Sequence, residues 1–278
     1  MRATCIVVAS STRVNTRLRS ATIGAMSPVK PSRRQLLAGL TVAPIVASTS
    51  YSQSPSRTFV LVHGAWHGGW CWKKVVPLLA AAGHRVLAPT LTGLGDRSHL
   101  LTPDVDLDTH IKDINAVFHY EDVHDAILVG HSYGGMVVAG VAPSVIQRLA
   151  GVVYLDAFLP DDGKALQDYV ALRAPDDVWR LPPPGTAPRF GVKDAADVTW
   201  MEARLTDQPR RAMTQAVRIA ADVSARVPHT FILCTKANQF AAAAERARQR
   251  GFKYRELLSA GHDAMITQPT ELAKLLLE

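Results

Sequence analysis

Cysteine and charge are both scarce in this chain of 278 residues. Its three cysteines, Cys5, Cys71 and Cys234, form no CxxC pair and show no metal-ligand spacing, so they give no sign of a disulfide scaffold or a zinc module. Cys234 lies in an apolar stretch and Cys71 at the start of an expected helix, and we expect both to be small buried thiols. With 20% charged and 47% hydrophobic residues, the chain can bury a sizeable core as one globular domain.

Acidic residues are absent from the first 53 residues, which hold seven of the 31 lysines and arginines. The remainder of the chain is therefore formally neutral, although the whole chain carries a net charge of +7. A domain that binds nucleic acid needs basic residues clustered on its folded part. We therefore expect no nucleic-acid partner.

A long apolar run is also missing. The run that follows Arg33 and Arg34 ends at Ala47, and it is too short to cross a hydrocarbon core of about 30 Å, so we expect no stable membrane anchor. Paired arginines before such a run resemble a twin-arginine export signal, at about residues 26–53 of a leader that spans 1–53. This predicts a periplasmic or secreted protein; a basic tail on a cytoplasmic protein is the alternative.

Apolar stretches alternate with amphipathic ones throughout residues 54–278. Strands are expected at Thr58 to Val62, His84 to Ala88, Ala126 to Val129, Gly151 to Leu155, His229 to Cys234 and Lys253 to Leu257. Helices are expected at Trp70 to Ala82, Asp108 to Phe118, Met136 to Val145, Asn238 to Arg250 and Thr270 to Leu277. The alternation predicts an α/β fold, with a mainly parallel sheet of about six strands covered by helices on both faces.

One interval interrupts this alternation, after the fourth expected strand. Residues 157–227 are too many for a structureless loop, and they contain two expected helices, at Val198 to Leu205 and Pro209 to Asp222. We predict a small helical cap inserted here, lying over the carboxyl ends of the strands, where such sheets bind their ligands.

The segment Gly130-His131-Ser132-Tyr133-Gly134 fills a GxSxG pattern between an expected strand and an expected helix. That position is typical of a nucleophile elbow, in which a sharp turn projects the serine hydroxyl from the backbone. A Cβ at either flanking glycine would collide with the neighbouring strand or helix. We therefore predict that Ser132 is a nucleophile.

A serine hydroxyl needs a base and an oxyanion site to react with an ester. His262 follows the last expected strand, and it is the best-placed histidine for the base; the chain order, with the serine first and the histidine last, suits this role. The backbone N–H groups of Ala65, after the first strand, and Tyr133, after the serine, are the predicted oxyanion donors.

Several segments resemble one branch of the α/β-hydrolase superfamily, which contains plant methyl-salicylate-type esterases and hydroxynitrile lyases. The resemblance rests on four segments and covers nearly all of residues 58–278: His63-Gly64-Ala65-Trp66-His67-Gly68-Gly69-Trp70, Gly83-His84-Arg85-Val86, Gly130-His131-Ser132-Tyr133-Gly134-Gly135-Met136 and His262-Asp263-Ala264-Met265. The run from Pro89 to Arg97 looks more like bacterial esterases of this branch. The resemblance implies a serine hydrolase without a cofactor, with a helical cap over a largely apolar pocket.

The triad acid departs from this pattern. The plant relatives place an aspartate just after the strand that matches His229 to Cys234, but residues 235–240 hold no carboxylate. An aspartate after the preceding strand is an alternative position in α/β-hydrolases, and Asp156 occupies it. We predict Asp156 as the acid. A structural role for Asp156 is the alternative, and Asp263 is a weaker rival because adjacent side chains diverge.

Aromatic residues near these loops are candidate pocket walls, and we select Trp66, Phe158 and Trp179. His63 and His67 flank a strand end and a glycine-rich loop without a carboxylate partner, so no metal site is predicted.

The sequence alone leaves three candidate functions. The first is hydrolysis of small hydrophobic or aromatic carboxylic esters through an acyl-enzyme. The second is cyanohydrin cleavage. The resemblance to the plant lyases implies a threonine after the histidine of the first motif and a lysine after the catalytic histidine, but this chain has Gly64 and Asp263 at these positions. The third is a ligand-binding or sensing protein on a hydrolase scaffold with weak turnover.

Overall fold

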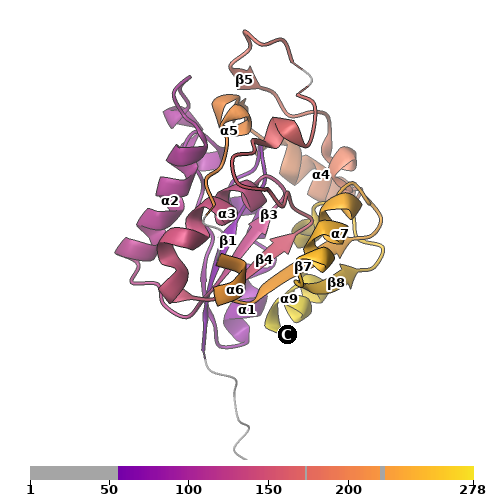
Figure 1. Ribbon diagram of the computed structural model, residues 1–278. Helices are drawn as coiled ribbons and strands as arrows, with labels where there is room; N and C mark the ends of the chain where they lie inside the picture. Colours follow the sequence, from indigo (N-terminus) through magenta and orange to yellow (C-terminus); the bar gives the residue numbers. More distant parts are fainter. Residues whose placement is uncertain (1–55, 173, 220–222) are drawn as a thin grey trace, which may run out of the picture. The chain divides into compact units, whose positions relative to one another are not determined.

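Six parallel strands form the central sheet of the described chain. The computed structural model describes residues 56–278 except 173 and 220–222, so the predicted leader at 1–53 lies outside the described residues. The strands are β1 (Thr58–Val62), β2 (Arg85–Leu87), β3 (Ala126–His131), β4 (Leu149–Leu155), β7 (His229–Cys234) and β8 (Lys253–Leu257). Their order is β2-β1-β3-β4-β7-β8, and all neighbouring pairs are parallel (Figure 1). The predicted sheet is confirmed.

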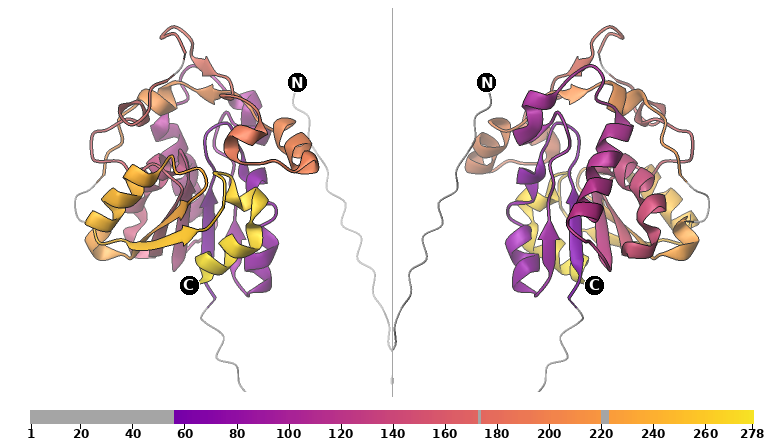
Figure 2. Two further views of the ribbon diagram at one scale, coloured as in Figure 1. Left: turned by 90° about the vertical axis from the view of Figure 1, so that its right-hand side faces the viewer. Right: turned by 90° about the vertical axis from the view of Figure 1, so that its left-hand side faces the viewer.

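Helices cover both faces of this sheet, as Figure 2 shows. They are α1 (Val76–Ala81), α2 (Leu107–Tyr120), α3 (Gly134–Val145), α7 (Ala241–Gln249), α8 (Ala264–Thr267) and α9 (Pro269–Leu277). In β1, Val60 and Val62 belong to the core beneath α2, α3 and α7, whereas Phe59 and Leu61 belong to the core beneath α1 and α9. Because both faces are buried, β1 is a continuous apolar run.

The predicted helix at Trp70 to Ala82 is divided in the structure. A 3₁₀ turn (Gly69–Trp72) precedes α1, and Pro77 lies in the first turn of α1. Proline is tolerated in a first turn because the N–H that it lacks has no helical partner there, but it breaks a helix interior. Pro77 therefore allows α1 to begin near Val76 and prevents one continuous helix.

The described residues of the cap, which spans 157–227, form short elements. They are β5 (Arg180–Leu181) and β6 (Gln208–Pro209), which pair antiparallel, α4 (Ala195–Glu202), α5 (Arg211–Thr214), α6 (Val223–Arg226) and the 3₁₀ turns Leu166–Asp168 and Ala187–Phe190. The predicted helix at Pro209 to Asp222 is wrong over residues 215–219, which follow α5 and are not helical; its last three residues lie outside the described ones. The Val217 backbone instead bonds to a distant part of the cap: its N–H donates to the Lys164 carbonyl, and its carbonyl accepts the N–H of Gly163. A helix would leave those cap backbone groups without partners.

The cap lies over the carboxyl ends of the strands, with β5 and α5 at the top of the view in Figure 1. Leu166, Leu181, Phe190 and Met213 of the cap line a cavity together with residues that follow β1, β3 and β4. Within the described part of the chain, none of the helices combines the length and the apolar character that a membrane span requires.

Candidate active site

Ser132 lies on a strained turn between β3 and α3. Its φ of 54° is in the left-handed region, which costs a non-glycine residue free energy unless the surroundings enforce it. A Cβ on Gly130 would lie 2.6 Å from the Gly134 oxygen, and a Cβ on Gly134 would lie 2.8 Å from the Val62 oxygen of β1. The two glycines therefore let the strand and the helix approach closely enough to form the turn, as predicted.

His262 and Asp156 form a buried pair. His262 follows β8, Asp156 follows β4, and the His262 Nδ1 lies 2.6 Å from Asp156 Oδ2. The Asp156 side chain is fully buried and that of His262 is 6% exposed. A carboxylate accepts, so Nδ1 carries the proton and Nε2 is the basic nitrogen of the neutral ring. Asp263, the weaker rival, makes no hydrogen bond with the His262 ring among the described residues.

The end of β7 contributes a backbone donor to Asp156. The N–H of Cys234, the last residue of β7, donates to Asp156 Oδ1 at 3.1 Å. The Asp156 backbone N–H donates to the Ile232 carbonyl, and its φ of 41° is also left-handed. These contacts fix the carboxylate between two strands, with one oxygen on Cys234 and the other on His262.

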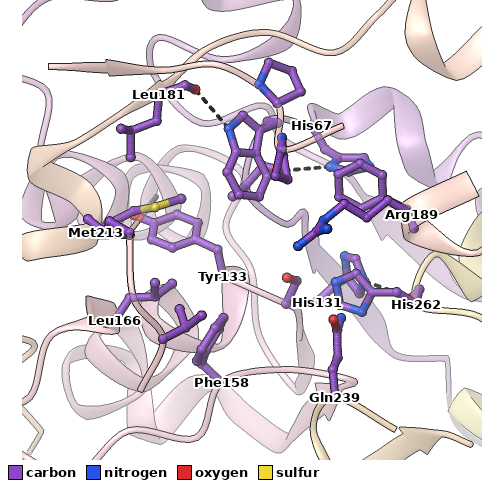
Figure 3. A pocket seen from close by; sticks show the side chains of 18 of the residues that line it. His67, His131, Tyr133, Phe158, Leu166, Leu181, Arg189, Met213, Gln239 and His262 are labelled. Atoms are coloured by element: carbon purple, nitrogen blue, oxygen red, sulfur yellow. Dashed lines mark hydrogen bonds between the residues drawn. The ribbon is translucent and has the colours of Figure 1, made fainter. Parts of the chain in front are cut away.

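Ser132 and His262 line one cavity of about 510 Å³. Figure 3 shows Phe158, Leu166, Leu181 and Met213 along one side of it, and His131, His262, Arg189 and Gln239 along the other. The Ser132 hydroxyl has no hydrogen bond among the described residues; in such sites the serine–histidine bond is often long before substrate binds.

The predicted pocket walls divide between the cavity and the surface. Trp66 and Phe158 line the cavity. Trp179 does not, and its prediction as a wall is wrong: it is 37% exposed, with the Arg180 guanidinium against its ring. The residues that follow it in the cap, Leu181 to Pro184, form the wall instead. The Trp66 indole N–H donates to the Leu181 carbonyl there.

The two predicted oxyanion donors, Ala65 and Tyr133, also line the cavity. Among the described residues neither backbone N–H has a hydrogen-bond acceptor. The Tyr133 side chain is fully buried, and its hydroxyl donates to Nδ1 of His110, whose Nε2–H is bonded to the Thr92 carbonyl. The residue after the nucleophile is thereby fixed to α2, and its N–H remains available to a substrate oxygen.

His63 and His67, which lie in the loop after β1, have separate roles. His63 donates from Nδ1 to the Gly64 carbonyl and accepts the Leu91 N–H at Nε2, and burial lowers its pKa to about 3. It is a neutral structural residue. His67, in contrast, has the carboxylate partner that the sequence did not indicate, since Asp263 Oδ2 lies 2.9 Å from its Nε2. The two residues are 196 positions apart, so no local pattern could have revealed the contact.

One group of side chains in the described chain has the composition of a metal site. His131, His262 and Asp263 are buried, with ligand-type atoms within 4.8 Å of one another. Three of their atoms have partners: Asp156 for His262 Nδ1, His67 for Asp263 Oδ2, and the His262 carbonyl for His131 Nε2. His131 Nδ1 and Asp263 Oδ1 are buried without a hydrogen-bond partner among the described residues. The pairing of His262 with Asp156 and of Asp263 with His67 accounts for the position of both side chains without an ion, and we assign no metal here.

The cysteines take no part in this chemistry. Cys71 and Cys234 are both buried free thiols, as predicted. Burial raises the pKa of each thiol well above its ordinary value, which keeps both protonated and unreactive.

Comparisons with known proteins identify the family of the chain. A carbendazim hydrolyzing esterase from Nocardioides sp. (strain SG-4G) is 37% identical over 237 residues, which cover 78% of this chain and 97% of that protein. Methylesterase 7 of Arabidopsis thaliana is 28% identical over 248 residues, covering 80% and 95%. The solved structure of an extracellular alpha/beta-hydrolase from a Paenibacillus species superposes with a TM-score of 0.67 at 22% identity, covering 80% and 98%. Residues 59–275 match the alpha/beta hydrolase family, and the chain belongs to this family.

Proposed function

We propose that the protein is a serine esterase that cleaves small hydrophobic or aromatic carboxylic esters through an acyl-enzyme intermediate. One observation carries the proposal: His262, bonded to Asp156 at 2.6 Å, lines the same cavity as Ser132. A nucleophile, a base and an orienting acid therefore meet at one apolar pocket. Relatives that align over most of the chain are named esterases, which supports the same class.

The reaction follows from these positions. His262 Nε2 takes the proton of the Ser132 hydroxyl as Oγ bonds to the ester carbonyl carbon, and the Ala65 and Tyr133 N–H groups stabilise the oxyanion. His262 then gives the proton to the leaving alcohol as the carbon–oxygen bond breaks, which leaves an acyl-serine. Water attacks this ester in the same way, releases the acid and regenerates the serine.

The cavity favours small apolar substrates. Its volume of about 510 Å³ lies within the usual range of small-molecule pockets, about 300–1,000 Å³. Aromatic and aliphatic side chains line most of it, including Trp66, Phe158, Leu166 and Phe240. Arg189 and Gln239 also line the cavity, so a polar substituent on the substrate would be accommodated near them.

Cyanohydrin cleavage fits the site poorly. Asp263 takes the position of the lyase lysine, but its fully buried side chain is bonded to His67 and is not part of the cavity lining. Gly64 has no hydroxyl, and a Cβ there would lie 2.9 Å from the Ser132 Cβ. The site therefore offers no cationic lysine to stabilise cyanide.

Hydrolysis of p-nitrophenyl esters from acetyl to octanoyl, together with the benzoate, tests the proposal. We expect the protein without residues 1–53 to turn over these esters, and the acyl length at which kcat/KM is highest then measures how much of the cavity the acyl group can use. A p-nitrophenyl phosphonate should label Ser132 with one equivalent, located by peptide mass spectrometry. Folded protein that binds these esters without turnover or labelling would indicate the sensing alternative, and release of benzaldehyde from mandelonitrile would indicate the lyase.

We also propose export through a twin-arginine signal, which Arg33, Arg34 and the apolar run to Ala47 support. Residues 1–53 fused to a folded reporter enzyme should deliver it to the periplasm of a bacterial host. The paired Arg33→Lys and Arg34→Lys variant is the matched control, and it should retain the reporter in the cytoplasm. Equal fractionation of the two fusions would contradict export by this route.

A further inference from the structure

A second histidine–aspartate pair lies behind the proposed catalytic residues, and the mechanism above does not use it. His67 and Asp263 have side chains that are 1% and 0% exposed, and Nε2 of His67 lies 2.9 Å from Asp263 Oδ2. His67 belongs to the loop that carries the Ala65 oxyanion donor, and Asp263 directly follows His262. The pair therefore connects two parts of the site that are far apart in the sequence.

The hydrogen bonds of His67 define its proton count. Its Nδ1 lies 2.7 Å from the Ala65 carbonyl oxygen, which can only accept, so Nδ1 carries a proton. A proton also lies between Nε2 and Asp263 Oδ2, because a bare nitrogen facing a bare carboxylate would have no donor. Burial opposes charge on both groups, but their mutual attraction and hydrogen bond raise the pKa of His67 and lower that of Asp263. The pair is thus an imidazolium and a carboxylate.

On the oxyanion side, the pair holds a strained peptide. Trp66 has a φ of 65°, a left-handed conformation that a bulky residue adopts only when its surroundings enforce it. The peptide between Ala65 and Trp66 is held at both polar groups: its carbonyl accepts from His67, and its N–H donates to Gln208 Oε1 at 3.2 Å. Releasing His67 would let this peptide rotate, and the adjacent Ala65 N–H would lose its orientation.

On the base side, the pair fixes the loop that carries His262. The Asp263 side chain is bonded to His67, while its backbone N–H donates to the Phe190 carbonyl. His131, which precedes the nucleophile, donates from Nε2 to the His262 carbonyl at 3.1 Å. The other Asp263 oxygen, Oδ1, lies 3.7 Å from that same nitrogen. The nucleophile elbow, the oxyanion loop and the histidine loop therefore share one buried polar network.

We infer that His67 and Asp263 are positioning residues, a buried ion pair that sets the oxyanion donor of Ala65 relative to the imidazole of His262. The inference rests on the proposed esterase function. Oxyanion donors act on charge that develops only in the transition state, so a displaced donor lowers kcat and leaves KM almost unchanged. A displacement of about 1 Å in such a site can cost about 10²-fold in rate.

Asp263→Asn and His67→Gln test the inference, because both keep hydrogen-bonding groups and approximate size while removing the ion pair. We expect each to lower kcat on p-nitrophenyl butyrate about 10²-fold, with KM within about twofold. The double variant should be no slower than the slower single, since both changes break one interaction. Phosphonate labelling of Ser132 should slow by the same factor. Glu121→Gln, which removes the exposed ion pair with Arg85, is the control and should keep kcat.

A measurement that needs no activity separates this inference from the esterase proposal. Nitrogen-15 NMR of the histidine side chains should show one ring that stays doubly protonated above the ordinary histidine pKa of about 6.5. Its signal should disappear in His67→Gln, and the ring should lose a proton in Asp263→Asn. A neutral His67 in the wild type would overturn the charged pair. Unchanged kcat per folded molecule in both variants, with only the melting temperature lowered, would overturn the positioning role. Absence of any ester turnover or Ser132 labelling in the wild type would instead overturn the proposed function.

Discussion

Ser132→Ala is expected to lower kcat by about 10⁶-fold, the loss typical of a serine hydrolase without its nucleophile. The Ala65 and Tyr133 N–H groups and the apolar cavity remain in the variant, so binding of the ester and stabilisation of an oxyanion persist. No covalent intermediate can form, and water must attack directly. KM should stay close to its wild-type value, because the hydroxyl contributes little to binding the ground state.

Folding of this variant should be almost unaffected. The Ser132 hydroxyl makes no hydrogen bond among the described residues, and alanine meets the same left-handed backbone that serine already tolerates. Ser98→Ala, at an exposed position, is the matched control and should keep full activity. The measurement is kcat and melting temperature side by side. A residual rate above about one hundredth of the wild type in a folded variant would assign the chemistry to another nucleophile.

Asp156→Asn is expected to lower kcat by about 10⁴-fold, because the change reverses the histidine tautomer. The Cys234 N–H should keep its bond to the remaining carbonyl oxygen, which turns the new amide NH₂ toward His262 Nδ1. That nitrogen must then accept, so the ring proton moves to Nε2. An Nε2 that carries a proton cannot take one from Ser132.

The test for Asp156 separates catalysis from structure. We expect the melting temperature of Asp156→Asn to fall by only a few degrees, since both hydrogen bonds retain a partner, while kcat collapses. Asp177→Asn is the matched control. It removes a carboxylate at an exposed position and should leave kcat unchanged. Near-normal kcat in folded Asp156→Asn protein would remove Asp156 from the triad and leave it a structural link between β4 and β7.

Local patterns predicted most of the sheet and the elbow. The bounds of β1 and β7 agree with the predicted ones, because a strand buried on both faces needs a mainly apolar run. The bounds of β8 also agree, although this edge strand is polar and partly exposed. The elbow needs glycines at two fixed positions, so Gly130 and Gly134 revealed it directly. The topology of the sheet then limits which loops can meet Ser132, and this is how His262 and Asp156 could be selected.

Contacts between distant segments could not be predicted in the same way. The bond between His67 and Asp263 joins two loops that show no shared pattern. In the cap, the pairing of Val217 with Lys164 overrides the helical tendency of the residues after α5. Trp179 was expected in the pocket because aromatic residues often line pockets, but which side chains before and after β5 face the cavity depends on the assembled fold.

The cap has an evolutionary consequence. Ser132, Asp156 and His262 all follow strands of the sheet, whereas Leu166, Leu181, Phe190 and Met213 come from one contiguous insertion built of short turns. Substitutions, and even insertions, in that segment can reshape the cavity while the sheet keeps its register and the reacting atoms keep their spacing. Selection can thus exchange one ester for another through changes in a single stretch of chain. A laboratory library confined to the cavity-lining residues Leu166, Leu181 and Met213 would search substrate preference while leaving Gln208 and Phe190, which position the reacting groups, unchanged.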